Sequence, residues 1–331
     1  MTPLRLVFLG SDPIALPALE WLAGEGGALA RPVAVFTQPD RPAGRGMAIR
    51  PNAIKAWALD HKLPVLQPER LGAAERAALQ DLRPDLALVM AYGRILSEEF
   101  IGVPRIATVN LHASLLPKYR GASPIQCSIA SGERESGVSL MRIVRRLDAG
   151  PVADSQSVEI GPLDTALDLE EKLAAACVPL LARALPSLAA GNLNFTDQDD
   201  GKASYCRRLT KGDGVLDFAA SGEALAARIN GLFPWPGCSA EFAGTWVRVG
   251  LADLAPGAAR PTGVPAGSVL GPDAEGLLVA CGSGVLRLRR LQRPGGRMLG
   301  AGDFLRGFPV APGTVLPSLE MPPLVGAEPF R

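Results

Sequence analysis

Short apolar runs alternate with helical segments through the first half of the chain, and this alternation restricts the possible folds most. Residues 4–10 and 86–92 are apolar runs of strand length, whereas residues 51–62 and 73–82 have helical patterns. Strands that alternate with helices predict an α/β fold with a mainly parallel, doubly wound sheet. The layout is Rossmann-like, but the first turn has Gly10 without a G-x-G-x-x-G pattern, so we expect no dinucleotide site.

The character of the sequence changes after about residue 210. A long helical segment at 164–191 precedes a polar, turn-rich stretch, and short strand-like pieces separated by Gly and Pro follow. Such spacing is typical of a small β-barrel. A chain of 331 residues can bury two cores. We therefore predict an α/β domain at 1–190, a linker at 191–209 and a barrel domain at 210–331.

Composition argues against several classes of protein. The five cysteines are far apart and form no C-x-x-C pair, so neither a metal site nor a disulfide framework is expected, and a reducing cytoplasm fits. The first residues lack the pattern of a signal peptide, and no apolar run reaches the ~18 residues that a membrane span needs. The net charge of +1 does not indicate nucleic acid, although arginines cluster at 37–55 and 287–306.

Two polar side chains stand at the end of the strand expected at 106–112. Asn110 and His112 are two residues apart, so on a strand they point to the same side, at the end where open α/β sheets bind ligands. Asp148 follows the end of another expected strand and could hold His112 in its charged form. With Asn110 as an oxyanion donor, the three groups suit attack of an amine on a carbonyl without a protein nucleophile.

Structural roles remain open for the same residues. A histidine near a strand end more often has a structural role, and an aspartate before Ala-Gly more often forms a turn. The other histidine, His61, is expected to be a solvated residue at a helix end. The arginines near residue 287 could simply line the exposed side of one strand.

Longer motifs resemble a known family. NLHASLLPKYRGASPIQ (110–126) resembles the signature of the formyltetrahydrofolate-dependent transformylases, and SGVSLMRIVRRLDAGPV (136–152) resembles the block that supplies their aspartate. TQPDRPAGRG (37–46) resembles the acceptor-binding loop of the methionyl-tRNA formyltransferase family. Residues 229–242 and 291–307 resemble its C-terminal domain, so the resemblance runs in order through nearly the whole chain.

The resemblance implies formyl transfer in translation initiation. In the family, 10-formyltetrahydrofolate donates its formyl group to the α-amine of methionine on initiator tRNA, with no metal. Asn110, His112 and Asp148 match the catalytic three, and a formyltransferase fold followed by an OB-like barrel is implied. An OB fold is a common platform for nucleic acid. We expect a cytoplasmic monomer whose partners are the charged tRNA and the folate, without a membrane.

The resemblance also implies two sets of binding residues. The folate set comprises the S-L-L-P motif and the stretch after the 86–90 strand: Ser114, Leu115, Leu116, Pro117, Ala91, Tyr92, Gly93 and Ile95. The tRNA set comprises arginines of the acceptor loop and of the C-terminal domain: Arg41, Arg45, Arg287, Arg289, Arg293 and Arg297.

The chain departs from the family pattern at two places, and other activities stay open. Met47, Ala48 and Ile49 stand where basic residues are expected, and the first turn reads Gly-Ser-Asp-Pro instead of Gly-Thr-Pro. No role follows for the three arginines before Asp148, which are Arg142, Arg145 and Arg146. The alternatives are a sugar-nucleotide N-formyltransferase, a folate-dependent hydrolase and a non-enzymatic module that binds RNA or folate.

Overall fold

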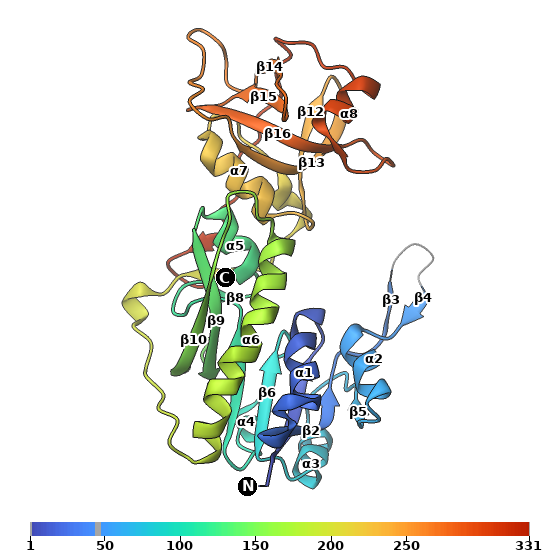
Figure 1. The fold of residues 1–331 in the computed structure, drawn as a ribbon, viewed down its shortest axis with the longest axis vertical. Coiled ribbons are helices and arrows are strands. Elements are labelled where there is room, and N and C mark those ends of the chain that lie inside the picture. The colour runs from blue at the N-terminus through green and yellow to red at the C-terminus, as the bar shows by residue number, and fades with distance from the viewer. Residues whose placement is uncertain (1, 44–47, 331) are drawn as a thin grey trace. The chain divides into compact units, whose positions relative to one another are not determined.

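The chain forms two compact units in the computed structural model, which describes residues 2–43 and 48–330 (Figure 1). Both units combine segments that are separated in sequence. The domain boundaries expected at residues 190 and 210 therefore stay a prediction. Unit 1 consists of Met1–Arg120, Gly137–Val158 and Glu170–Ala203, and unit 2 of Gly121–Ser136, Glu159–Leu169 and Ser204–Arg331.

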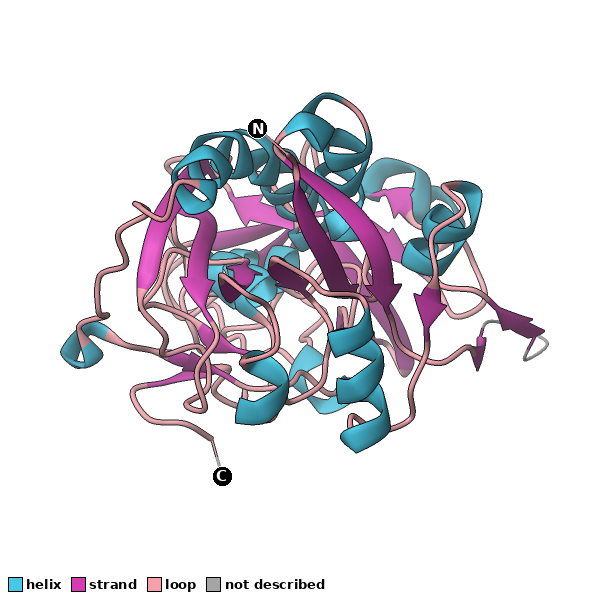
Figure 2. Cartoon of the chain, turned by 90° about the horizontal axis from the view of Figure 1, so that it is seen from below, coloured by secondary structure: helices cyan, strands magenta, loops and turns pink. Residues whose placement is uncertain are grey.

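A seven-stranded sheet in the order β10-β9-β7-β6-β1-β2-β5 is central to unit 1. The pairings from β7 through β5 are parallel, whereas β9 runs antiparallel to β7. Figure 2 shows these strands side by side with helices along them. The mainly parallel sheet is confirmed. The strands are β1 Leu4–Gly10, β2 Ala30–Phe36, β5 Val65–Leu66, β6 Leu86–Met90, β7 Ala107–His112, β9 Glu135–Arg142 and β10 Val152–Glu159.

Local sequence signals set the starts of the helices. Asp12 accepts a hydrogen bond from the Ile14 backbone and caps a 3-10 turn that leads into the first helix, and Asn52 and Ser97 cap later helices in the same way. These side chains satisfy backbone N–H groups that a helix leaves unpaired. The helices are α1 Leu16–Ala23, α2 Ala53–Asp60, α3 Ala73–Asp81, α4 Glu98–Ile101, α5 Pro124–Ala130, α6 Ala166–Ala189, α7 Gly222–Gly231 and α8 Ala301–Gly307.

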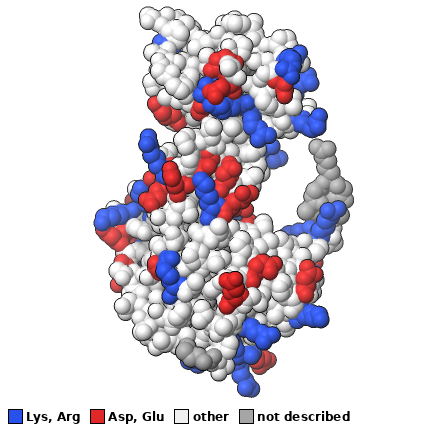
Figure 3. All heavy atoms as spheres, viewed as in Figure 1, with Lys and Arg blue, Asp and Glu red and all other residues white. Residues whose placement is uncertain are grey.

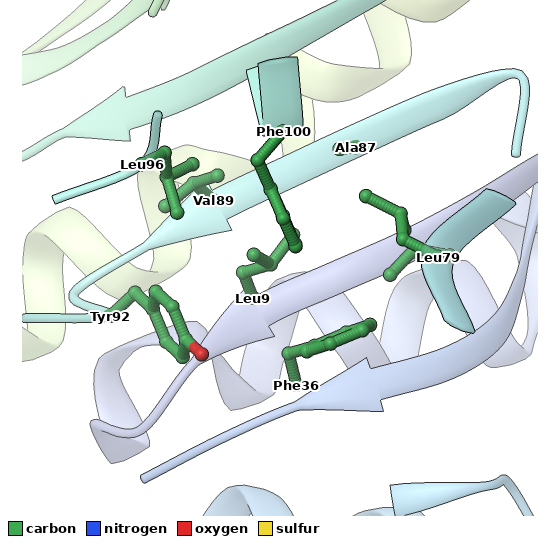
Figure 4. Packing of buried hydrophobic residues seen from close by; sticks show 9 residues of the cluster. Leu9, Phe36, Leu79, Ala87, Val89, Tyr92, Leu96 and Phe100 are labelled. Atoms are coloured by element: carbon green, nitrogen blue, oxygen red, sulfur yellow. The ribbon is translucent and has the colours of Figure 1, made fainter. Parts of the chain in front are cut away.

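Apolar side chains of β1, β2 and β6 form a core cluster with α3 and α4 (Figure 4). Phe36 and Phe100 meet edge to face, with ring centroids 5.8 Å apart. Tyr92, directly after β6, is part of the same cluster. Each buried side chain of this size contributes about 1.5–3 kcal/mol to folding. The packing holds the carboxyl ends of the parallel strands in fixed positions.

An antiparallel sheet forms most of the last part of unit 2. Its order is β12-β13-β16-β15-β14, with β17 paired to β16, and α7 packs on β13. The expectation of a second, mainly β fold in the last part of the chain is therefore confirmed, and its sheet is antiparallel. Its strands are β12 Cys238–Phe242, β13 Thr245–Leu254, β14 Val269–Pro272, β15 Leu277–Ala280, β16 Val285–Gln292 and β17 Leu299–Gly300.

The remaining strands are short. The hairpin of β3 Arg41–Ala43 and β4 Ala48–Arg50 flanks the undescribed residues 44–47. A small sheet joins β8 Arg120–Gly121, β11 Tyr205–Cys206 and β18 Val325–Gly326. By length and composition alone, helix α6 is long and apolar enough to cross a membrane. Half of its apolar 18-residue stretch is buried within the protein, as in a core helix. A search for uninterrupted apolar runs in the sequence does not find this helix. A mean hydropathy over 18 residues tolerates isolated charged residues and does find it.

Candidate active site

Strand β7 places Asn110 and His112 at its carboxyl end. The strand lies between β6 and β9, where Asn110 is opposite Met141 and His112 is opposite Ser139. Because side chains alternate along a strand, the two side chains lie on the same face. Asn110 is half-buried and His112 is only 5% exposed. The predicted pair therefore lies at the end of the sheet where ligands of such folds bind.

Both ring nitrogens of His112 face oxygen atoms. Nε2 lies 2.9 Å from the carbonyl oxygen of Tyr119, and Nδ1 lies 3.8 Å from Oδ2 of Asp148. A carbonyl oxygen can only accept, so Nε2 carries a hydrogen and donates a hydrogen bond to the backbone carbonyl of Tyr119. At 3.8 Å the contact with Asp148 is an ion pair and not a direct hydrogen bond. The second proton of a charged imidazole would therefore lie on Nδ1, beside the carboxylate.

Asp148 reaches His112 from the loop after β9. Strand β9 ends at Arg142, and we call residues 143–151 the Asp148 loop. Asp148 has a φ angle of +45°, in the left-handed region that residues other than glycine seldom adopt. Such conformations concentrate at functional sites, where the surrounding structure holds them. The structure thus brings together the imidazole and carboxylate that the sequence placed on separate strand ends.

The S-L-L-P motif forms a loop that is fastened to β9 through one serine. Ser114 is fully buried and its hydroxyl donates to the carbonyl of Lys118 over 2.6 Å. Ser139 on β9 donates to the Ser114 carbonyl and accepts from the Leu116 backbone N–H. Leu115, Leu116 and Pro117 are half-buried. The Ser114 hydroxyl is thus occupied inside the loop, and Ser139, which the sequence reading did not select, fixes the loop.

The stretch after β6 divides into exposed residues and one core residue. Ala91, Gly93 and Ile95 are exposed, and Ile95 is 95% exposed. Tyr92 instead points its ring into the core cluster, and burial raises the pKa of its hydroxyl to about 12. Its carbonyl accepts a hydrogen bond from the side chain of Gln38. The tyrosine ring is thus a core residue, whereas its neighbours are open to a ligand.

The arginines expected to contact tRNA fall into different environments. Arg287 and Arg289 on β16 are paired with acidic residues, and Arg287 is only 6% exposed. Arg293 and Arg297 are exposed. Arg41 is exposed and pairs with Glu69, while Arg45 and Met47 lie outside the described residues. Acidic and basic side chains intersperse on the face shown in Figure 3, so no broad basic surface appears there.

Within residues 2–43 and 48–330, no group of three or more His, Cys, Asp or Glu side chains is placed to hold a metal ion. The five cysteines are free thiols and all are buried.

Comparisons with known proteins agree with the fold. The family described as formyl transferase matches residues 4–185, and the formyl transferase C-terminal domain matches residues 208–309. A methionyl-tRNA formyltransferase of Methylococcus capsulatus is 43% identical over 312 residues, which cover 93% of this chain and 98% of that protein. A second, from Pseudomonas paraeruginosa, is 42% identical over 302 residues, covering 91% and 95%.

A solved structure shares the fold. The N-formyltransferase from Helicobacter canadensis, in complex with folinic acid and dTDP-3-aminofucose, has a TM-score of 0.66 to this chain. It is 18% identical, and the match covers 86% of this chain and 99% of that one. At this identity the likeness concerns the fold alone. Identity above 40% along almost the entire length of both relatives shows more: the chain belongs to the methionyl-tRNA formyltransferase family.

Proposed function

We propose that this protein transfers the formyl group of 10-formyltetrahydrofolate to the α-amino group of methionine on initiator methionyl-tRNA. The observation that carries the proposal is the approach of His112 and Asp148 to 3.8 Å at the end of the strand that also bears Asn110. An amide donor, an imidazole and a carboxylate are the groups that acyl transfer to an amine requires. The family gives the donor and the acceptor.

The reaction follows from these three groups. The amine attacks the formyl carbon, a carbon–nitrogen bond forms, and the carbonyl electron pair moves to oxygen. Asn110 donates a hydrogen bond to that oxyanion, which typically contributes about 3 kcal/mol, and protonated His112 stabilises the oxyanion by its positive charge. The attacking nitrogen loses one proton as it becomes an amide. As the oxyanion collapses, the bond to the folate nitrogen breaks, and that nitrogen takes up one proton, so that the amine loss and the folate gain balance. No covalent intermediate with the protein forms.

The support for the His112 role comes from its two neighbours. Tyr119 accepts the Nε2 proton through its backbone, so the ring orientation is set by a group that does not titrate. Asp148 faces the other nitrogen and favours the charged ring by its negative charge. In this proposal the carboxylate orients the ring and does not react with the substrate.

The folate would lie against the exposed residues at the ends of β6 and β7. Leu115, Leu116 and Pro117, with Ala91, Gly93 and Ile95, are the predicted folate residues whose side chains or backbone remain accessible. Ser114 and Tyr92 stay in the predicted set as residues that shape the loops from inside. For tRNA, the exposed Arg41, Arg293 and Arg297 remain candidates, and Arg45 keeps its predicted role. Arg287 and Arg289 have their guanidinium groups occupied by carboxylates.

The proposal includes a monomer in the cytoplasm. Five free thiols suit a reducing compartment, and the reaction needs no second subunit to complete the catalytic three. Sedimentation of the purified protein measures its oligomeric state.

The test of the activity compares acceptors. Purified protein is mixed with 10-formyltetrahydrofolate and with methionyl-initiator-tRNA, free methionine or an amino-sugar nucleotide. We expect formylation of the charged tRNA alone. Formylation of the sugar or of free methionine without the tRNA would reject the proposed acceptor, and release of formate without any acceptor would indicate a hydrolase.

A further inference from the structure

Residues 195–200, which the sequence reading assigned to a linker, lie against the Asp148 loop within unit 1. The Phe195 ring lies under the guanidinium of Arg142, 4.2 Å from the ring centroid. Thr196 exchanges two backbone hydrogen bonds of 2.9 Å with Val152. The Gln198 side chain donates through Nε2 to the carbonyls of Asp148, at 2.8 Å, and Gly150, at 2.6 Å. The segment therefore contacts the two residues that flank the loop and two residues within it.

Arg120 anchors the other side of Gln198. Its side chain is 0% exposed, and Nε and Nη2 both donate to Oε1 of Gln198, at 3.0 and 2.8 Å. Its Nη1 pairs with Asp200 at 2.9 Å. Arg120 directly follows Tyr119, whose carbonyl accepts the His112 proton. One connected path thus runs from the His112 partner through Arg120 and Gln198 to the backbone of Asp148.

A second bridge runs parallel to the first. Asp200 pairs with Arg146 of the Asp148 loop at 2.8 Å as well as with Arg120. The hydrogen bonds from Arg146 and Arg120 lower the pKa of the Asp200 carboxyl. Asp200 and Arg146 are largely exposed, so this ion pair contributes little on its own. Buried Arg120 anchors both bridges, and the bridge through Gln198 is the stronger one because Gln198 is half-buried whereas Asp200 and Arg146 are exposed.

The Asp148 loop needs such support. Asp148 is in the left-handed region, which costs roughly 1–2 kcal/mol for a residue with a side chain. Gly150 is packed so closely that an added Cβ would lie 1.9 Å from the Arg142 carbonyl. The two carbonyls that Gln198 contacts belong to these two residues. Loss of the amide donors would remove two of the hydrogen bonds that hold the loop in this conformation.

We infer that Gln198 is a positioning residue for formyl transfer, which holds Asp148 at its distance from His112 and is itself held by Arg120. An amide suits the place because one end accepts from a guanidinium while the other donates to two carbonyls. The inference rests on the proposed roles of His112 and Asp148. A displacement of about 1 Å at a catalytic group can lower turnover about 100-fold.

Gln198→Glu tests the inference most directly. The carboxylate still accepts hydrogen bonds from Arg120. Its second oxygen replaces the amide donor and faces two carbonyl oxygens, so the hydrogen bonds to the loop are lost. We expect kcat to fall about 10- to 100-fold, with KM for folate and tRNA changed less than about two-fold.

Gln156→Glu is the matched control. Gln156 on β10 also accepts from an arginine, Arg183, at 2.9 Å, and also donates to a backbone carbonyl, that of Ser157. The Gln156→Glu substitution thus makes the same chemical change beside a guanidinium, at a place without contact to the Asp148 loop. This variant should keep the parent kcat. An equal loss of kcat in both variants would overturn the inference.

Gln198→Met covers the case in which the glutamate variant does not fold. Methionine has a similar length but removes both hydrogen-bonding functions, and it should lower kcat in the same way while thermal unfolding stays cooperative. Parent kcat in a folded Gln198 variant would overturn the positioning role. Asp148→Asn separates the proposed catalytic site from the positioning role of Gln198. If Asp148→Asn keeps full activity, the proposed site is wrong. If it loses activity and the Gln198 variants do not, only the positioning role is wrong.

Discussion

The catalytic end of β7 and the arginine cluster on β16 use charged groups in opposite ways. Arg287 pairs with three carboxylates, those of Asp253, Asp273 and Glu275. His112 instead faces one carboxylate, at 3.8 Å. A cation surrounded by anions is held in one state, whereas one near a single anion can still respond to a charge that develops on a ligand. Under the proposed roles, this difference in the number of carboxylates distinguishes the structural charge of Arg287 from the reactive charge of His112.

The largest expected effect is that of His112→Ala. Loss of the charge that stabilises the oxyanion should lower kcat by about 10²–10³-fold. Stability should fall far less, by about 1–3 kcal/mol, because the loss is limited to the hydrogen bond to the Tyr119 carbonyl and the ion pair with Asp148. Single-turnover formylation and thermal unfolding measure the two quantities. A protein that unfolds outright would show that the histidine has a structural role, and the comparison would then break down.

Arg287→Ala should give the reverse result. Removing a buried guanidinium leaves carboxylates without their counter-charge, which typically costs about 3–5 kcal/mol. Below its melting temperature the variant should retain kcat and the KM for charged tRNA. Denaturant unfolding and steady-state kinetics test this. A raised KM for tRNA with unchanged stability would return Arg287 to the set of tRNA contacts.

Arg297→Ala sharpens the contrast at the exposed end of the same region. Each phosphate contact contributes to the salt dependence of binding, so the slope of log affinity against log salt should fall by about one. The KM for methionyl-tRNA should rise several-fold while folate affinity and stability stay unchanged. Binding of the charged tRNA at several salt concentrations measures the slope. An unchanged slope would remove Arg297 from the proposed tRNA surface.

Tyr92→Phe should have the smallest effect. The Tyr92 hydroxyl is buried without a hydrogen-bond partner among the described residues, so its removal should change stability by at most about 1 kcal/mol. Burial raises the pKa of this hydroxyl to about 12. The folded protein thus keeps the proton longer than the unfolded chain, whose tyrosines ionise near pH 10.

The stability of the parent protein and of the Tyr92→Phe variant at alkaline pH follows from this difference in tyrosine pKa between the folded and unfolded states. Below pH 10 the parent and Tyr92→Phe should respond to pH alike. Between pH 10 and about 12 the parent should lose more stability than the variant, because unfolding releases the tyrosine proton there. Denaturant unfolding at successive pH values measures this. Parallel stability curves up to pH 12 would show that the hydroxyl is not buried in solution.

Periodicity in the sequence determined the mainly parallel sheet and the common face of Asn110 and His112. Strand alternation acts over two residues, so the relation between these side chains needs no knowledge of the rest of the fold. The ends of parallel strands meet at one edge, which also allowed Asp148 to be placed near them. The motifs around these residues then indicated the family.

Only the tertiary structure decided which other polar residues support the site and which are part of the framework. Arg287 is buried because β13 and β16 pair with Asp253 directly opposite it, a register that no local pattern determines. Gln198 lies in a polar stretch that resembles a linker, yet its partners are 48 to 78 residues away in sequence. Hydrogen bonds over such separations depend on how the chain closes on itself, so they cannot be predicted from neighbouring residues.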